Sequence, residues 1–122
     1  MTVNKELFQK IHVQITAMPK SLDMNDWGRK SECGTTMCVA GWAVALSHEP
    51  TDLDWTVSGY GLPDRLTGVY TRSGWESGWE SIANRAEELL GLDEDTAYEL
   101  FHHSTDDEAR EIVEEYASGT RD

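Results

Sequence analysis

The chain contains few of the residues that are typical of secreted, membrane-spanning or zinc-binding proteins. Of its 122 residues only two are cysteines, Cys33 and Cys38, and its most apolar stretch, Met37–Leu46, has ten residues. A helix that spans a bilayer needs about 20, so we expect no membrane partner. We expect no signal peptide either, since Met1–Glu6 leads into an amphipathic pattern rather than an apolar run. Two cysteines without an export signal are typical of the reducing cytoplasm.

Basic residues are scarce in the second part of the chain. Residues 1–50 hold five acids and five bases, whereas residues 51–122 hold 18 acids and five arginines and therefore carry the whole net charge of −13. Contact with phosphates requires a basic surface, so this composition argues against direct nucleic-acid binding. Three interpretations remain for the acidic half: a solvated face, a surface for a basic partner protein, or a nucleic-acid mimic that occupies a basic groove.

Catalytic signatures are also missing. The sequence has no His-Glu-x-x-His segment, no glycine-rich phosphate loop and no recognisable Ser-His-Asp pattern. The adjacent histidines His102 and His103 follow a predicted helix, where a histidine favours the negative end of the helix dipole. We therefore predict a non-enzymatic protein without a cofactor. A small enzyme or ligand-binding module that uses Cys33 and Cys38 is the alternative.

The spacing of the two cysteines does not match a structural zinc site, which usually has two pairs of ligands. If both lay in one helix, Cys33 and Cys38 would point about 140° apart, at 100° per residue. We interpret them as buried free thiols, because lone cysteines behave mostly as small hydrophobic residues. A disulfide and a metal-stabilised domain with Cys33, Cys38 and His48 as ligands stay open as alternatives.

The stretch Met37–Leu46 predicts a buried helix over about 35–47, because none of its residues is charged and all except Gly41 are apolar. A glycine within a helix costs about 1 kcal/mol relative to alanine. Together with the alanines at positions 40, 43 and 45, Gly41 therefore predicts the close approach of another helix. The same small residues could belong to a contact with a second copy, which leaves a homo-oligomer open.

Four further segments combine apolar residues at helical spacing with recognisable ends. They span about 4–18, 79–90, 93–101 and 105–118, and the last opens with a capping box at Thr105–Glu108 and ends before Gly119. No segment shows the sustained alternation of polar and apolar residues that is typical of a strand. The sequence therefore predicts a single all-α domain, residues 1–122: a compact bundle of about five helices around the buried one.

The segment 51–78 has no helical periodicity, and we expect an irregular insertion rich in glycine and aromatic residues. At its end Gly-Trp-Glu-Ser occurs twice in tandem, from residue 74 to 81. On a helix, this period of four would place Trp75 and Trp79 on one face. The side chains of these tryptophans either pack a loop against the core or form an exposed contact for a partner protein. The predicted partner-binding residues are Trp75, Trp79, Tyr70, Glu111, Glu114 and Glu115.

The order of these features resembles an uncharacterised family of small proteins from actinobacteriophages and actinobacteria. The resemblance lies mainly in the run Cys33-Gly34-Thr35-x-x-Cys38-x-Ala40-Gly41-Trp42-Ala43, with further matches at Asp23–Trp27, Ala86–Leu92, Ala97 and Leu100–Phe101. It implies a phage-encoded accessory protein of the host-cell cytoplasm, and no activity that could be carried over. We therefore predict a protein that binds and modulates a host protein, whose identity the sequence does not give.

Overall fold

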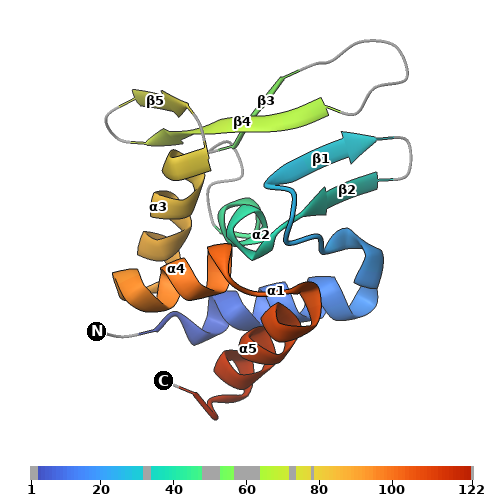
Figure 1. Cartoon of the computed structure of the whole chain (residues 1–122), viewed down its shortest axis with the longest axis vertical. Coiled ribbons are helices and arrows are strands. Elements are labelled where there is room, and N and C mark those ends of the chain that lie inside the picture. Colours follow the sequence, from blue (N-terminus) through green and yellow to red (C-terminus); the bar gives the residue numbers. More distant parts are fainter. Residues whose placement is uncertain are drawn as a thin grey trace.

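The computed structural model describes residues 3–31, 34–47, 53–56, 64–71, 74–77 and 79–121. Within these residues the chain forms five α-helices, one short 3-10 helix and an antiparallel sheet of five strands. The prediction of an all-α bundle is therefore wrong, and the fold is mixed α/β. In Figure 1 all the helices lie on one side of the sheet.

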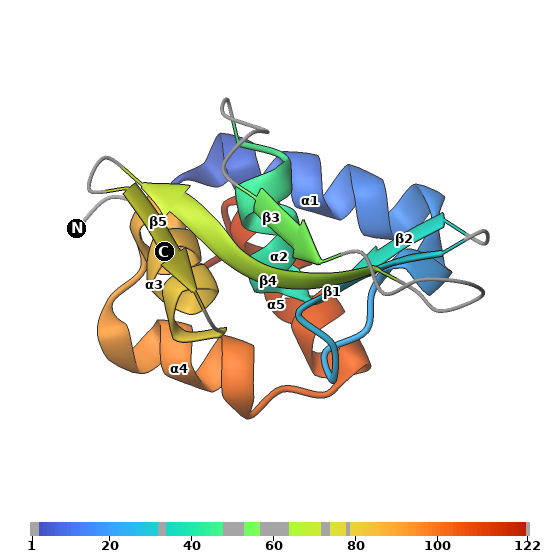
Figure 2. The same ribbon diagram turned by 90° about the horizontal axis from the view of Figure 1, so that it is seen from above.

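Five strands make up the sheet: β1 (Gly28–Ser31), β2 (Gly34–Met37), β3 (Leu53–Thr56), β4 (Asp64–Thr71) and β5 (Gly74–Ser77). The longest, β4, is the centre of the sheet. Arg65 pairs with Arg29 of β1 and also with Thr56 of β3, so β1 and β3 lie on opposite edges of β4. Gly68 likewise pairs with both β3 and β5. Strands β1 and β5 therefore follow one another along the same edge, as seen from above in Figure 2.

The strands escape detection in the sequence because they are short and because β4 is irregular. Four of them have only four residues each, which is too few for sustained alternation. Opposite β3, the pairing on β4 skips from Gly68 to Leu66 and leaves a bulge at Thr67. Leu66 and Val69 are therefore both buried although they are three residues apart. The predicted irregular insertion of residues 51–78 in fact contributes β3, β4 and β5.

The helices are α1 (Lys5–Ala17), α2 (Val39–Ala45), α3 (Trp79–Leu90), α4 (Glu94–His102) and α5 (Asp106–Ser118), with the 3-10 helix η1 at Pro19–Ser21. Four of these, α1, α3, α4 and α5, lie where the sequence predicts helices. Asp93 caps α4, and the predicted capping box at Thr105 and the left-handed Gly119 bound α5. None of the described helices has the length and apolar character needed to cross a bilayer.

Helix α2 lies at the centre of the core, between the sheet and α1 (Figure 1). Its residues from Val39 to Val44 are all buried, which confirms the prediction of a buried helix. It starts later than the predicted residue 35, because Gly34–Met37 pairs with β1 as a strand. The indole N–H of Trp42 donates to the carbonyl oxygen of Ser21 at 2.8 Å, and this hydrogen bond connects α2 to η1.

The close approach to Gly41 comes from a different neighbour than predicted. A Cβ atom at this position would meet the backbone carbonyl oxygen of Trp27 and the side chain of Met37. These atoms belong to the segment before β1 and to β2, not to another helix. Because Gly41 is covered by its own chain, it cannot lie in a contact with a second copy.

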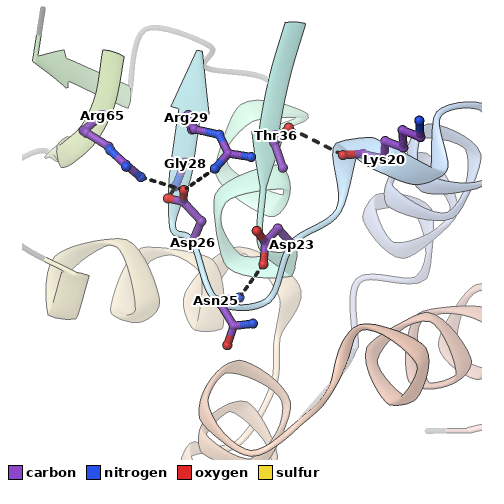
Figure 3. Close-up of polar contacts among 8 residues, drawn as sticks. All are labelled: Lys20, Asp23, Asn25, Asp26, Gly28, Arg29, Thr36 and Arg65. Carbon is purple, nitrogen blue, oxygen red and sulfur yellow. Dashed lines mark hydrogen bonds and ion pairs between the residues drawn. The ribbon is translucent and has the colours of Figure 1, made fainter. Parts of the chain in front are cut away.

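Asp26 joins the two parts of the sheet (Figure 3). Within the described residues, strands β1 and β4 share two residue pairs, and one of them sets Arg29 directly opposite Arg65, an unfavourable pairing of like charges. The Asp26 Oδ2 atom lies 2.7 Å from Arg65 Nη1 and 3.5 Å from Arg29 Nη1. Its other oxygen accepts the Gly28 N–H at 3.2 Å. Asp26 thus offsets the repulsion and holds the two strands together.

We expect the substitution Asp26→Ala to lower the free energy of unfolding by about 1–2 kcal/mol, since the arginines are partly exposed and solvent screens the pairs. Chemical denaturation measures the change. A matched control is Asp23→Ala, whose carboxylate accepts the exposed Asn25 N–H at 2.9 Å (Figure 3). Equal stability losses in the two variants would show that Asp26 does not join the strands.

Candidate functional site

The structure separates the two groups of predicted partner-binding residues. Tyr70 of β4 and Trp75 of β5 are paired across neighbouring strands, and Trp79 is the first residue of α3. Trp75 and Trp79 do not lie on one helix, as a shared helical face would require, because Gly74–Ser77 forms a strand. Helix α5, with its glutamates, lies at the other end of the molecule (Figure 1). The aromatic and acidic groups therefore do not form one site.

The three glutamates of α5 differ in their surroundings. Glu111 and Glu114 are exposed to solvent. Glu115 is half-buried and its carboxylate lies 3.0 Å from Arg121 Nε. Its carbonyl oxygen also accepts the backbone N–H groups of Thr120 and Arg121, just past the end of α5. Glu115 therefore stabilises the helix end, and Glu111 and Glu114 are the better candidates for contact with a partner.

Cys38 is a buried free thiol, as predicted. Its thiol donates to the carbonyl oxygen of Trp27 at 3.9 Å, and burial raises its pKa to about 12. A thiol of this kind is almost wholly protonated at neutral pH and is a poor nucleophile. Cys33 and His48, the other two ligands of the alternative metal site, lie outside the described residues. Within the described part of the chain, no three His, Cys, Asp or Glu side chains gather in a metal-binding arrangement.

A groove between α3 and α4 is a candidate site that the sequence did not predict. It has a volume of about 210 Å³. Its apolar lining comes from Ala83 of α3 and from Ala97 and Phe101 of α4, with Tyr98 beside them. The polar residues that line it are Glu80, Asn84, Glu87, Glu94 and His102. We refer to these nine residues as the α3–α4 groove.

Two small residues and an exposed aromatic ring shape this groove. Ala83 and Ala97 come from different helices, and their side chains are too short to fill the space between them. Tyr98 is 57% exposed, although its ring lies against His102 and His103, with centroid distances of 4.9 and 5.0 Å. The His102 ring in turn meets Trp27 edge-on at 5.7 Å. These contacts hold an aromatic side chain at the surface beside an apolar hollow.

Three carboxylates surround the groove, and no arginine in the described part of the chain forms an ion pair with them. Within the described residues, Glu80, Glu87 and Glu94 form no ion pair. The two arginines of helices α3–α5 are directed to other groups. Arg85 lies 3.7 Å from Glu88, and Arg110 donates to carbonyl oxygens of Ile15 and Pro19. Both arginines therefore leave the acidic groups of the groove uncompensated.

The sequence gives little sign of this groove. Ala83 and Ala97 belong to the apolar residues of the helices predicted over 79–90 and 93–101, where alanine is an ordinary core residue. That they border a hollow depends on how α3 and α4 pack after the turn at Gly91, which has a φ of 69°. The acidic character of this region, in contrast, is visible in the sequence.

Comparisons with known proteins identify no relative. No family model matches the chain, and neither a curated protein nor a solved structure is similar to it. The resemblance to the actinobacteriophage family therefore stays a prediction.

Proposed function

We propose that this chain is a non-enzymatic accessory protein that binds and modulates a partner protein with a basic surface. In the context that the family resemblance implies, the chain is encoded by a phage and the partner is a host protein. The observation that supports this function is the charge of helices α3, α4 and α5. They contain twelve acids and only two arginines, of which Arg85 lies near Glu88 and Arg110 donates to backbone carbonyl oxygens of other segments.

This distribution of charge favours binding of a basic protein. An extended surface of one sign attracts an oppositely charged partner and speeds their encounter. The groove volume of about 210 Å³ lies below the ~300–1,000 Å³ of typical small-molecule sites. A protein surface therefore fits this groove better than a cofactor or a drug-sized substrate.

The test is capture of the partner from host lysate by the tagged chain, followed by titration of the purified pair. We expect Glu111→Gln/Glu114→Gln to weaken binding about tenfold, which corresponds to ~1.4 kcal/mol. The charge-matched control, Glu6→Gln/Asp23→Asn, should bind as the unaltered protein does, and added salt should weaken binding.

Two results would contradict the proposal. One is that no protein is captured in stoichiometric amount. The other is a captured protein whose affinity responds neither to salt nor to the α5 substitutions, because the acidic surface would then serve only for solvation. A captured nucleic-acid-binding protein that duplex DNA displaces would identify the chain as a nucleic-acid mimic.

A further inference from the structure

We infer that the α3–α4 groove anchors the partner by receiving one of its arginine side chains. This inference rests on the proposed function, since it names the group through which a basic partner is held. It follows from three properties of the groove: its volume, its apolar lining and its uncompensated carboxylates.

The volume of the groove is suited to a single large side chain. Its volume of about 210 Å³ is smaller than the ~300–1,000 Å³ of typical small-molecule sites, so one long side chain fits it better than a whole small molecule. A bulky cofactor would be excluded, whereas one inserted side chain would displace the water of the groove.

The lining offers separate contacts for the two parts of an arginine. The methylene groups would lie against Ala83, Ala97 and Phe101, as the apolar stems of long basic side chains commonly do. The guanidinium group would then reach the exposed ring of Tyr98, which attracts a cation through its π face. An apolar side chain would make only the first of these contacts.

The carboxylates favour a cation over any neutral or acidic group. Glu80 and Glu87 are seven residues apart on α3, about two helical turns, and therefore project from the same face. Glu94 adds a third carboxylate from the first turn of α4. A planar guanidinium can donate two parallel hydrogen bonds to a carboxylate, which a lysine cannot do. The groove therefore selects arginine more strongly than lysine.

Titration with a short peptide tests this inference. The probe is a tetra-arginine peptide with blocked ends, and binding is followed by NMR through the methyl signals of Ala83 and Ala97. The control peptide contains citrulline, which keeps the shape of arginine but carries no charge. We expect saturable shifts with the arginine peptide, binding weaker by about tenfold with the corresponding tetra-lysine peptide, and no saturation with the citrulline peptide.

Two variants distinguish the binding of an arginine side chain inside the groove from general attraction by the negative charge of the protein. Ala83→Leu fills the hollow without changing the charge, and Tyr98→Ser removes the exposed ring. Each should weaken binding of the arginine peptide about tenfold, while Ala17→Leu on the exposed surface of α1 should leave it unchanged. Circular dichroism verifies that each variant is folded.

The outcomes distinguish the inference from the proposed function. If Glu111→Gln/Glu114→Gln weakens capture of the partner but Ala83→Leu and Tyr98→Ser leave peptide binding intact, the arginine anchor is wrong and the acidic binding surface stands. If neither set of substitutions has an effect, both proposals fail. Equal affinities for the arginine and citrulline peptides would also overturn the inference.

Discussion

Gly41→Ala is expected to destabilise the protein by about 2 kcal/mol, although alanine is the better helix former. Helix propensity alone would favour alanine by about 1 kcal/mol. The new Cβ would lie 2.9 Å from Met37 Cβ and closer still to the Trp27 carbonyl oxygen. Overpacking of a core costs about 1–3 kcal/mol and sometimes more. The steric cost therefore exceeds the gain in propensity.

The atoms around Gly41 have little freedom to move away. The carbonyl oxygen of Trp27 belongs to the backbone, so no side-chain rotation removes it. The next residue, Gly28, is itself covered, since a Cβ there would lie 2.7 Å from Leu66 Cβ. A shift of this segment would therefore disturb both α2 and the sheet, which places the steric cost at the upper end of the overpacking range.

Urea denaturation of Gly41→Ala measures this effect, with Ala45→Gly in the same helix as the control. The control should lose about 1 kcal/mol through propensity. A Gly41→Ala variant as stable as the unaltered protein, or more stable, would contradict this prediction. It would show that the segment before β1 moves away to accommodate the new methyl group.

Loss of stability at high pH is the second large effect that we expect, and Cys38 is its source. The residue occupies the N-cap position of α2, where the helix dipole and the N–H groups of Ala40 and Gly41 lower the pKa of a thiol. Burial has the opposite effect and is larger, and the charge of Asp26 adds to it, so the pKa rises from 9.0 to about 12. The folded state therefore favours the protonated thiol.

The sign of the pH dependence follows from this shift. Below pH 9 the thiol is protonated in both the folded and the unfolded states, so its full contribution to stability is present. Between pH 9 and about 12 only the unfolded state loses the proton. The free energy of unfolding should fall by ~1.4 kcal/mol per pH unit, or ~4 kcal/mol in total.

Comparison with Cys38→Ala isolates this effect from other groups that titrate at high pH. The difference in unfolding free energy between the two proteins should be constant below pH 9 and should shrink steadily above it. A constant difference up to pH 11 would contradict the assignment. Alkylation offers a second measurement: at pH 8, Cys38 should react with iodoacetamide only under denaturing conditions.

The positions of α1, α3, α4 and α5 could be predicted from the sequence because helices are stabilised by neighbours three and four residues away. Apolar spacing, the cap at Asp93 and the capping box at Thr105 are local signals. Burial of α2 was predictable for a related reason, since a helix without polar residues has no face to turn to water. The surplus of acids in the second half follows from composition alone.

The sheet, the state of Cys38 and the α3–α4 groove were decided by the tertiary structure. Each short strand is stabilised by partners far away in the chain, and the bulge at Thr67 removes the alternation that would have revealed β4. The pKa of Cys38 depends on whether Trp27 and its neighbours cover the start of α2. The groove exists because two alanines from different helices line the space beside Tyr98. Contacts between distant segments leave no periodic signal in the sequence, and here they determine both the fold class and the candidate site.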